Sequence, residues 1–174
     1  MGAVDLTAFP CDAPRPLASN LNYAPGQVVT NLAAVKLSAD GRLCVFVSNT
    51  TAVVIDVSGW WGPGASGHLA PVAAATRLVD TRPALMPFGS TLEIAAPAGA
   101  KVVLINLTVT GARAPGYLTA YPCGPGRPPT SNLNFAIGQL ISGAAMVAPG
   151  ANGKVCDYFH APTFFVADLV ARMG

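Results

Sequence analysis

The feature that most constrains this chain is an internal repeat with a constant offset of 112 residues. The motif LTAFPC at residues 6–11 recurs as LTAYPC at 118–123, and SNLNYAPGQ at 19–27 recurs as SNLNFAIGQ at 131–139. Without a gap, 22 of 52 positions are identical between residues 6–57 and 118–169. A repeat of this kind predicts that one structural unit is built twice.

The two copies differ in extent. Residues 65–115 precede the second copy and have no counterpart before the first within this sequence. We therefore expect about one and a half units: residues 1–62 as an incomplete first repeat, the back half of a unit, and residues 63–174 as a complete second repeat. Two arrangements are open for the half unit. In the first, which we favour because the connection between the copies is short, both copies share the central segment in one pseudo-symmetric body. In the second, a strand from another chain completes the first copy.

Composition favours strands over helices. The 174 residues include 18 Gly and 16 Pro spread along the whole length, and prolines at such intervals interrupt helices. Hydrophobic residues make up 52% of the chain, which argues against disorder. Short β-rich runs separated by turn signals predict an all-β fold, namely an antiparallel β-sandwich of the Ig-like kind.

Individual strands can be placed from β-branched runs and turn residues. Val102–Thr110 alternates so that Asn106, Thr108 and Thr110 share one face, and we expect it to form a hairpin with a return strand over residues 117–121. Turns are predicted at Asp40-Gly41 and Asn152-Gly153. Further strands are expected over residues 28–37, 43–47, 52–58, 78–82, 91–94, 140–148, 155–159 and 164–170.

Each copy contains two cysteines, 33 residues apart. Four cysteines allow three pairings, and a unit that is stable alone should carry its own bridge, so we expect Cys11–Cys44 and Cys123–Cys156. Disulfides persist in oxidising compartments, which predicts a secreted or cell-surface protein. Because the cysteines lack C-x-x-C spacing, we expect no bound metal, and no cofactor is indicated.

Four motifs in fixed order resemble a secreted β-repeat that is widespread in actinobacteria. They are VVIDVSGWW (53–61), RLVDTRP (77–83), NLTVTGARAPGYLTAYPCG (106–124) and RPPTSNLNF (127–135). The family is often appended to cell-wall hydrolases and other surface proteins. The resemblance implies a full unit over residues 77–173, the latter half of another over 1–61, and an accessory role without an established chemistry. The second copy ends in ADLVARM instead of a VDVSGYF-like sequence, as a terminal unit would.

Charge and residue inventory exclude several functions. The net charge is +2 without a basic cluster, so nucleic-acid binding is not expected, and no apolar run is long enough to span a bilayer. Catalysis would need His68 or His160 in a triad, or paired carboxylates drawn from Asp56, Asp80, Glu93, Asp157 and Asp168, and several of these lie in apolar strands. We therefore do not expect an enzyme.

Two groups of polar residues are candidates for a defined role. Asp56 and Asp168 lie in apolar strands and need partners, and Arg82 or Arg77 near Asp80 could pair with the aspartate of the last strand as a structural link. The SNLN motifs carry Asn20, Asn22, Asn132 and Asn134, which together with Tyr121 and Phe135 would suit a sugar site, although asparagines also bind loop backbone.

The sequence thus favours a non-catalytic, secreted structural or adhesive accessory module of a bacterial surface protein. The expected partners are other surface-protein domains or a protein partner. Two alternatives stay open: a carbohydrate-binding module that recognises glycans, and a strand-completed subunit of an extracellular assembly. Trp60 and Trp61 at the end of the first copy are expected to cover the junction between units rather than to bind a ligand.

Overall fold

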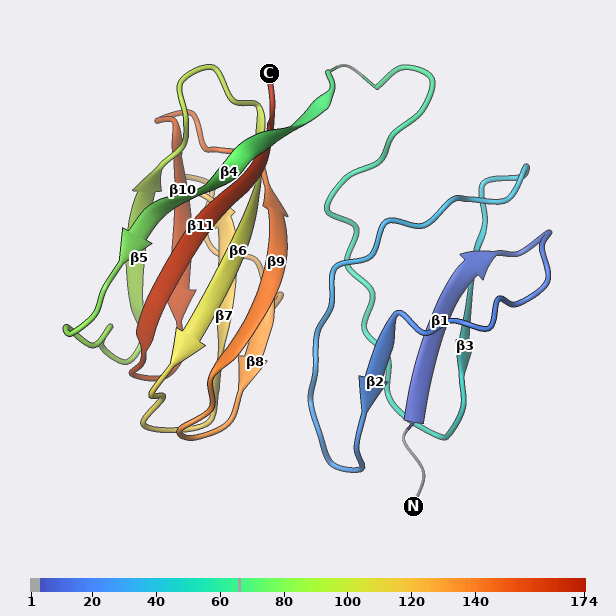
Figure 1. Ribbon diagram of the computed structural model, residues 1–174, viewed down its shortest axis with the longest axis horizontal. Helices are drawn as coiled ribbons and strands as arrows, with labels where there is room; N and C mark the ends of the chain where they lie inside the picture. The colour runs from blue at the N-terminus through green and yellow to red at the C-terminus, as the bar shows by residue number, and fades with distance from the viewer. Residues whose placement is uncertain (1–3, 66) are drawn as a thin grey trace. The chain divides into compact units, whose positions relative to one another are not determined.

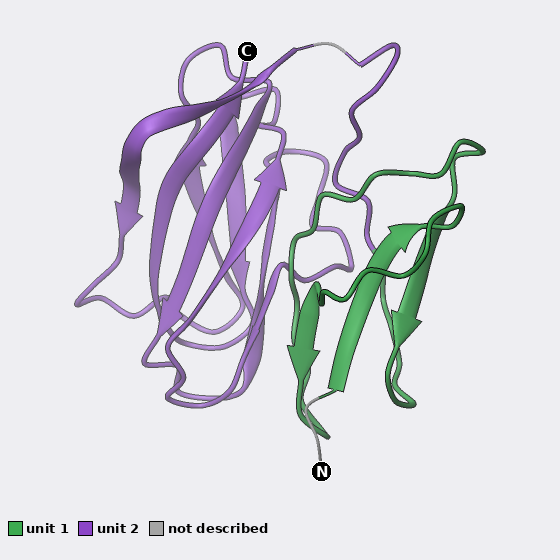
Figure 2. Cartoon of the chain, turned by 45° about the vertical axis from the view of Figure 1, so that its right-hand side comes forward, with its two compact units in different colours: residues 1–55 green, residues 56–174 purple. Residues whose placement is uncertain are grey.

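The computed structural model describes residues 4–65 and 67–174, and every regular element in them is a β-strand. The chain divides into two compact units, Met1–Ile55 and Asp56–Gly174, coloured separately in Figure 2. This division falls before the boundary after residue 62 that the repeat suggests. Residues 58–61 belong to the larger unit. Gly59 lies so close to the side chain of Met146 that a Cβ added at Gly59 would be 3.1 Å from the terminal methyl carbon of Met146.

The larger unit consists of two four-stranded antiparallel sheets (Figure 1). One sheet has the order β4-β11-β6-β9, with bounds Leu69–Asp80, Phe164–Met173, Val102–Thr110 and Ile141–Val147. The other has the order β5-β10-β7-β8, with bounds Ser90–Ala95, Lys154–Phe159, Gly116–Pro122 and Leu133–Phe135. The predicted all-β, antiparallel class is confirmed.

The core of this unit lies between the inner faces of its sheets. The central strand β6 alternates strictly, and the side chains of Val103, Ile105, Leu107 and Val109 are fully buried. They belong to one apolar cluster with residues of the opposite sheet, such as Leu118 of β7. The polar positions 106, 108 and 110 face outward, as the period of two predicts.

The predicted hairpin between β6 and β7 is wrong. β6 pairs with β11 and β9, whereas β7 pairs with β10 and β8, so the connection crosses from one sheet to the other. The linking loop turns inward, because Ala112 is buried and Gly138 donates its amide to the Ala112 carbonyl at 2.8 Å. Each strand buries an apolar face in the same core from opposite sides, which a hairpin in one sheet would not allow.

The smaller unit contains one three-stranded antiparallel sheet, β2-β1-β3, with bounds Leu21–Tyr23, Val4–Pro10 and Leu43–Val47. It reproduces β8-β7-β10 at the offset of 112 residues, including the register. Ala8 lies opposite Val45 in the smaller unit, and Ala120 lies opposite Asp157 in the larger one.

Two strands expected in the first copy are not formed. Residues 28–37 and 52–58 lie outside every strand, which corrects the prediction for both segments. The counterparts of these segments form parts of β9 and β11, and both of those strands pair with β6. Within residues 4–65 no strand corresponds to β6.

Both predicted disulfides are present. Cys11–Cys44 links the first turn of its unit to β3, and Cys123–Cys156 links the end of β7 to β10. The Cα–Cα distances are 4.9 and 5.0 Å, so the two copies place the bridge equivalently. The turn glycines Gly41 and Gly153 both have positive φ, 79° and 73°, a conformation that glycine adopts without steric cost.

Candidate functional site

The first asparagine of each SNLN motif holds its own unit together. The Oδ1 atom of Asn20 accepts a hydrogen bond from the backbone amide of Ala8 at 2.7 Å, and that of Asn132 accepts one from Ala120 at 2.8 Å. In the smaller unit this bond joins the residue before β2 to β1, and in the larger unit it joins the residue before β8 to β7. Asn20 and Asn132 thus each make a backbone contact, which is one of the two roles that the sequence left open.

Other residues that are identical in both copies also make the same internal bonds. The hydroxyl groups of Thr7 and Thr119 donate to the carbonyls of Ala18 and Thr130 at 2.7 and 2.6 Å. The side-chain carbonyls of Gln27 and Gln139 accept from the amides three residues earlier, at 2.9 and 2.8 Å. The repeated polar residues therefore form a duplicated internal framework.

The remaining sugar-site candidates lie in different surroundings within their own units. Phe135 lies in the apolar core, and Tyr121 packs on the Cys123–Cys156 bridge. Asn134 donates to the hydroxyl of Ser131 at 3.3 Å, and Asn22 is exposed on β2 of the smaller unit.

The predicted ionic link is centred on Arg77 of β4. Its Nε donates to Asp168 of β11 at 2.6 Å, and its Nη1 donates to Asp80 at 2.9 Å. Within the part of the chain that the structure describes, Arg82 forms its ion pair with Asp80 alone, through Nε at 2.9 Å and Nη2 at 2.6 Å. The Arg82 side chain and its backbone amide hold the pKa of Asp80 well below its usual range. Asp56, the counterpart of Asp168, is exposed, and within the described residues it takes part in no ion pair.

An aromatic cluster on the outer face of β7 and β10 was not identified from the sequence. The Tyr117 and His160 rings are stacked with centroids 4.7 Å apart, and Phe88 lies 5.4 Å from His160. The guanidinium of Arg127 lies 4.1 Å above the Tyr158 ring and donates to the Tyr117 hydroxyl at 3.2 Å. The sequence did contain a signal: Tyr117 and Tyr121, and likewise Tyr158 and His160, lie an even number of positions apart, which places each pair on one face of a strand.

Part of this cluster also occurs in the first copy. Arg15, the counterpart of Arg127, lies 3.7 Å above the ring of Phe46, the counterpart of Tyr158. This cation–π contact is therefore another repeated feature. The stacked pair is not repeated, because Asp5 and Ser48 stand at the positions of Tyr117 and His160.

One carboxyl group lies inside the larger unit. Asp157 of β10 alternates with the core residues Val155 and Phe159, and its side chain is fully buried. In the described residues neither of its carboxylate oxygens has a hydrogen-bond partner. Burial raises the pKa of Asp157 to about 8, so the group is predominantly neutral at pH 7. Its first-copy counterpart is Val45.

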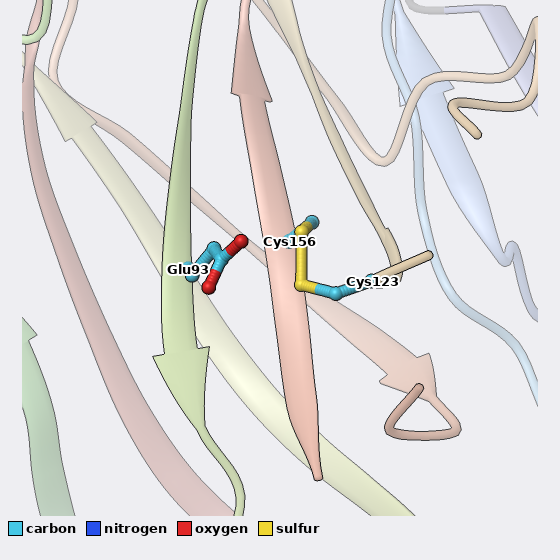
Figure 3. Close-up of side chains that lie close together, drawn as sticks. All are labelled: Glu93, Cys123 and Cys156. Carbon is cyan, nitrogen blue, oxygen red and sulfur yellow. A yellow bond between two sulfur atoms is a disulfide. The ribbon is translucent and has the colours of Figure 1, made fainter. Parts of the chain in front are cut away.

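Glu93 lies beside the second disulfide (Figure 3). One carboxylate oxygen and the sulfurs of Cys123 and Cys156 are within 4.8 Å of one another. Both sulfurs are bonded to each other at 2.05 Å, so neither is a thiolate that could bind a metal ion. The Glu93 carboxylate instead accepts a bond from Lys154 at 2.7 Å.

Two surface hollows have linings that include none of the SNLN asparagines. A hollow of about 250 Å³ in the larger unit is lined by Trp60 and Trp61 together with Val102, Met146 and Met173. A second, of about 530 Å³, is lined by residues of the smaller unit, among them Lys36 and Leu37.

Comparison of the chain with protein-family models, with curated proteins and with solved structures found no match. In the described residues there is also no helix with the length and apolar character needed to cross a bilayer.

Proposed function

We propose that the chain is a non-catalytic structural or adhesive accessory module of a secreted bacterial surface protein, built from Ig-like β-sandwich repeats. The observation that carries this proposal is the use made of the repeated polar residues. The side chains of Asn20, Thr7 and Gln27, and those of their counterparts, are engaged in matching internal hydrogen bonds. The polar residues that the two copies share therefore support a structural role for the repeat.

The two disulfides support an extracellular location. Each closes a separation of 33 residues within one copy, and together they account for all four cysteines. Such bridges are typical of oxidising compartments. The resemblance to actinobacterial secreted repeats points to the same location and to attachment beside other surface domains.

The proposal is tested by incubating the purified chain with bacterial cell-wall preparations and with soluble cell-wall fragments. We expect that neither preparation releases reducing sugars or peptides. The amount of the chain that sediments with the walls should not change when Asp80 is replaced with Asn. Turnover that depends on Asp80 would show an enzyme instead. A serum albumin control measures nonspecific sedimentation with the walls.

A second candidate function, glycan binding, is favoured by the outer aromatic cluster. Sugar rings stack on aromatic faces, and Phe88 is exposed next to the stacked Tyr117–His160 pair. Arg127 adds hydrogen-bond donors at the same place.

A glycan array distinguishes the two functions. If the cluster binds sugars, the wild-type chain gives reproducible signals that Phe88→Ala removes. Ile137→Ala, which replaces another exposed apolar side chain outside the cluster, is the matched control and should leave the signals unchanged. Signals unchanged in Phe88→Ala would assign any binding to another surface.

A further inference from the structure

The first copy leaves exposed an apolar segment that the second copy buries. Residues 52–55 of the smaller unit are the counterparts of 164–167 in β11. The exposed fractions of Val53, Val54 and Ile55 are 41, 86 and 58%, whereas those of Phe165, Val166 and Ala167 are 0, 5 and 0%. The same stretch of the repeat is thus apolar in both copies and buried in one.

The larger unit shows what covers this stretch. β11 lies between β4 and β6, and β6 pairs on its other edge with β9, the counterpart of residues 29–35. β5 pairs with the free edge of β10, the counterpart of β3. β4, β5 and β6 are therefore the three strands without a counterpart in residues 4–65, and they are consecutive in the chain.

We propose that the smaller unit is an acceptor for a polypeptide segment of the β4–β5–β6 type, which completes it by strand addition. The acceptor surface consists of residues 28–35, residues 52–55 and the free edge of β3. The incoming β6-type strand inserts between the first two, and the β5-type strand pairs with β3. This interaction surface goes beyond the proposed accessory function and does not depend on it.

The register of the added strands follows from the repeat. The pairing of Phe165 with Val109 and of Ala167 with Leu107 places the corresponding apolar residues of the new strand opposite Val53 and Ile55. The pairing of Cys156 with Glu93 places the β5-type strand opposite Cys44. The partner must therefore present apolar side chains at alternate positions of its third strand.

Charge gives the partner a further requirement. In the larger unit Asp168 accepts from Arg77 at 2.6 Å. Asp56, which follows the acceptor segment directly, is exposed and has no ion-pair partner in the described residues. A β4-type strand with arginine at the position of Arg77 supplies that partner.

A second copy of this chain is a poor donor. Its β6 is paired on both edges, and its inward side chains, from Val103 to Val109, are 0–1% exposed. Donation would dismantle the core of the larger unit. The occupant we infer is therefore a polypeptide segment of the β4–β5–β6 sequence type that lies outside residues 1–174.

The test adds a synthetic polypeptide of residues 76–111 of this chain to the full 174-residue protein. Hydrogen exchange measured by mass spectrometry should slow about tenfold or more in residues 28–35 and 52–55. Binding measured by calorimetry should be lost with Val53→Asp or Ile55→Asp and kept with Leu17→Asp, a fully exposed control outside the acceptor surface. Asp56→Lys should weaken binding, and Arg77→Asp in the added segment should restore part of it.

A fusion protein provides a second test in case the synthetic segment is poorly soluble. Residues 76–111 are duplicated and joined before residue 1 through a flexible Gly/Ser linker, and the same amides should be protected. Absence of protection in both experiments would overturn the proposal. Protection confined to β9 and β11 would mean exchange into the larger unit, and protection on self-association without the segment would assign the surface to a second copy; either result also overturns it.

Discussion

Replacing Asp157 with valine should stabilise the larger unit and change how its stability depends on pH. The buried carboxyl has a pKa of about 8 in the folded chain and a usual value of 3.8 when exposed. Between these values the folded state binds one more proton than the unfolded state, so the free energy of unfolding falls as the pH rises. The slope is about 1.4 kcal/mol per pH unit, and the loss between pH 4 and pH 7 is about 4 kcal/mol.

Valine is a suitable replacement because the first copy has Val45 at this position in the same register. Asp157→Asn is the matched variant that keeps the shape and removes only the ionisable group. Nothing in the structure explains why aspartate stands here in the second copy.

The assay is denaturant unfolding of the full chain from pH 4 to pH 8, with hydrogen exchange of the β10 amides to assign the transition to the larger unit. The wild-type curve should fall with pH, while both variants should lack the part of the slope that comes from Asp157. Parallel pH profiles for the wild type and Asp157→Val would refute the reasoning, because they would mean that Asp157 ionises at an ordinary pKa.

Three other perturbations follow from the described contacts. Arg77→Ala should lower the midpoint of thermal unfolding more than Arg82→Ala, because of these two arginines it is Arg77 that bonds to Asp168 of β11, and equal midpoints at pH 7 would contradict this expectation. Asn132→Ala should cost about 1–3 kcal/mol in chemical denaturation because it leaves the amide of the buried residue Ala120 without its acceptor, and Asn132→Asp, which keeps the acceptor oxygen, should recover most of this loss. Replacing Cys11 and Cys44 with serine should remove about 4 kcal/mol from the smaller unit, seen as loss of amide protection in β1 and β3 while β6 stays protected; loss of protection in both units would show that they unfold together.

The repeat made several features predictable from the sequence. It selected one disulfide pairing among three, because each copy had to bridge itself. The strand Val102–Thr110 was placed at its observed ends, and its buried face followed from strict alternation. These features are local or are copied from one half of the chain to the other, so a single sequence contains enough information to fix them.

Ionic pairing was predictable only in part. Arg77, Arg82, Asp80 and Asp168 were named as one group, but the sequence could not say which arginine reaches β11. The register of β4 against β11 decides this, since it places Arg77 opposite Asp168. The outer aromatic cluster was missed for a similar reason, because its rings come from residues far apart in the sequence, such as Phe88, Tyr117 and His160.

Strand formation itself was decided by tertiary structure. Residues 52–58 carry a β-rich sequence comparable to that of β11, yet they form no strand where β4-type and β6-type neighbours are absent. Asp157 likewise lies in a β-rich run, and its burial on the inner face of β10 became evident only in the folded unit. A strand is stabilised by hydrogen bonds to its neighbours and by the face they cover, so its sequence determines a capacity to pair, while the presence of the neighbours determines whether it does.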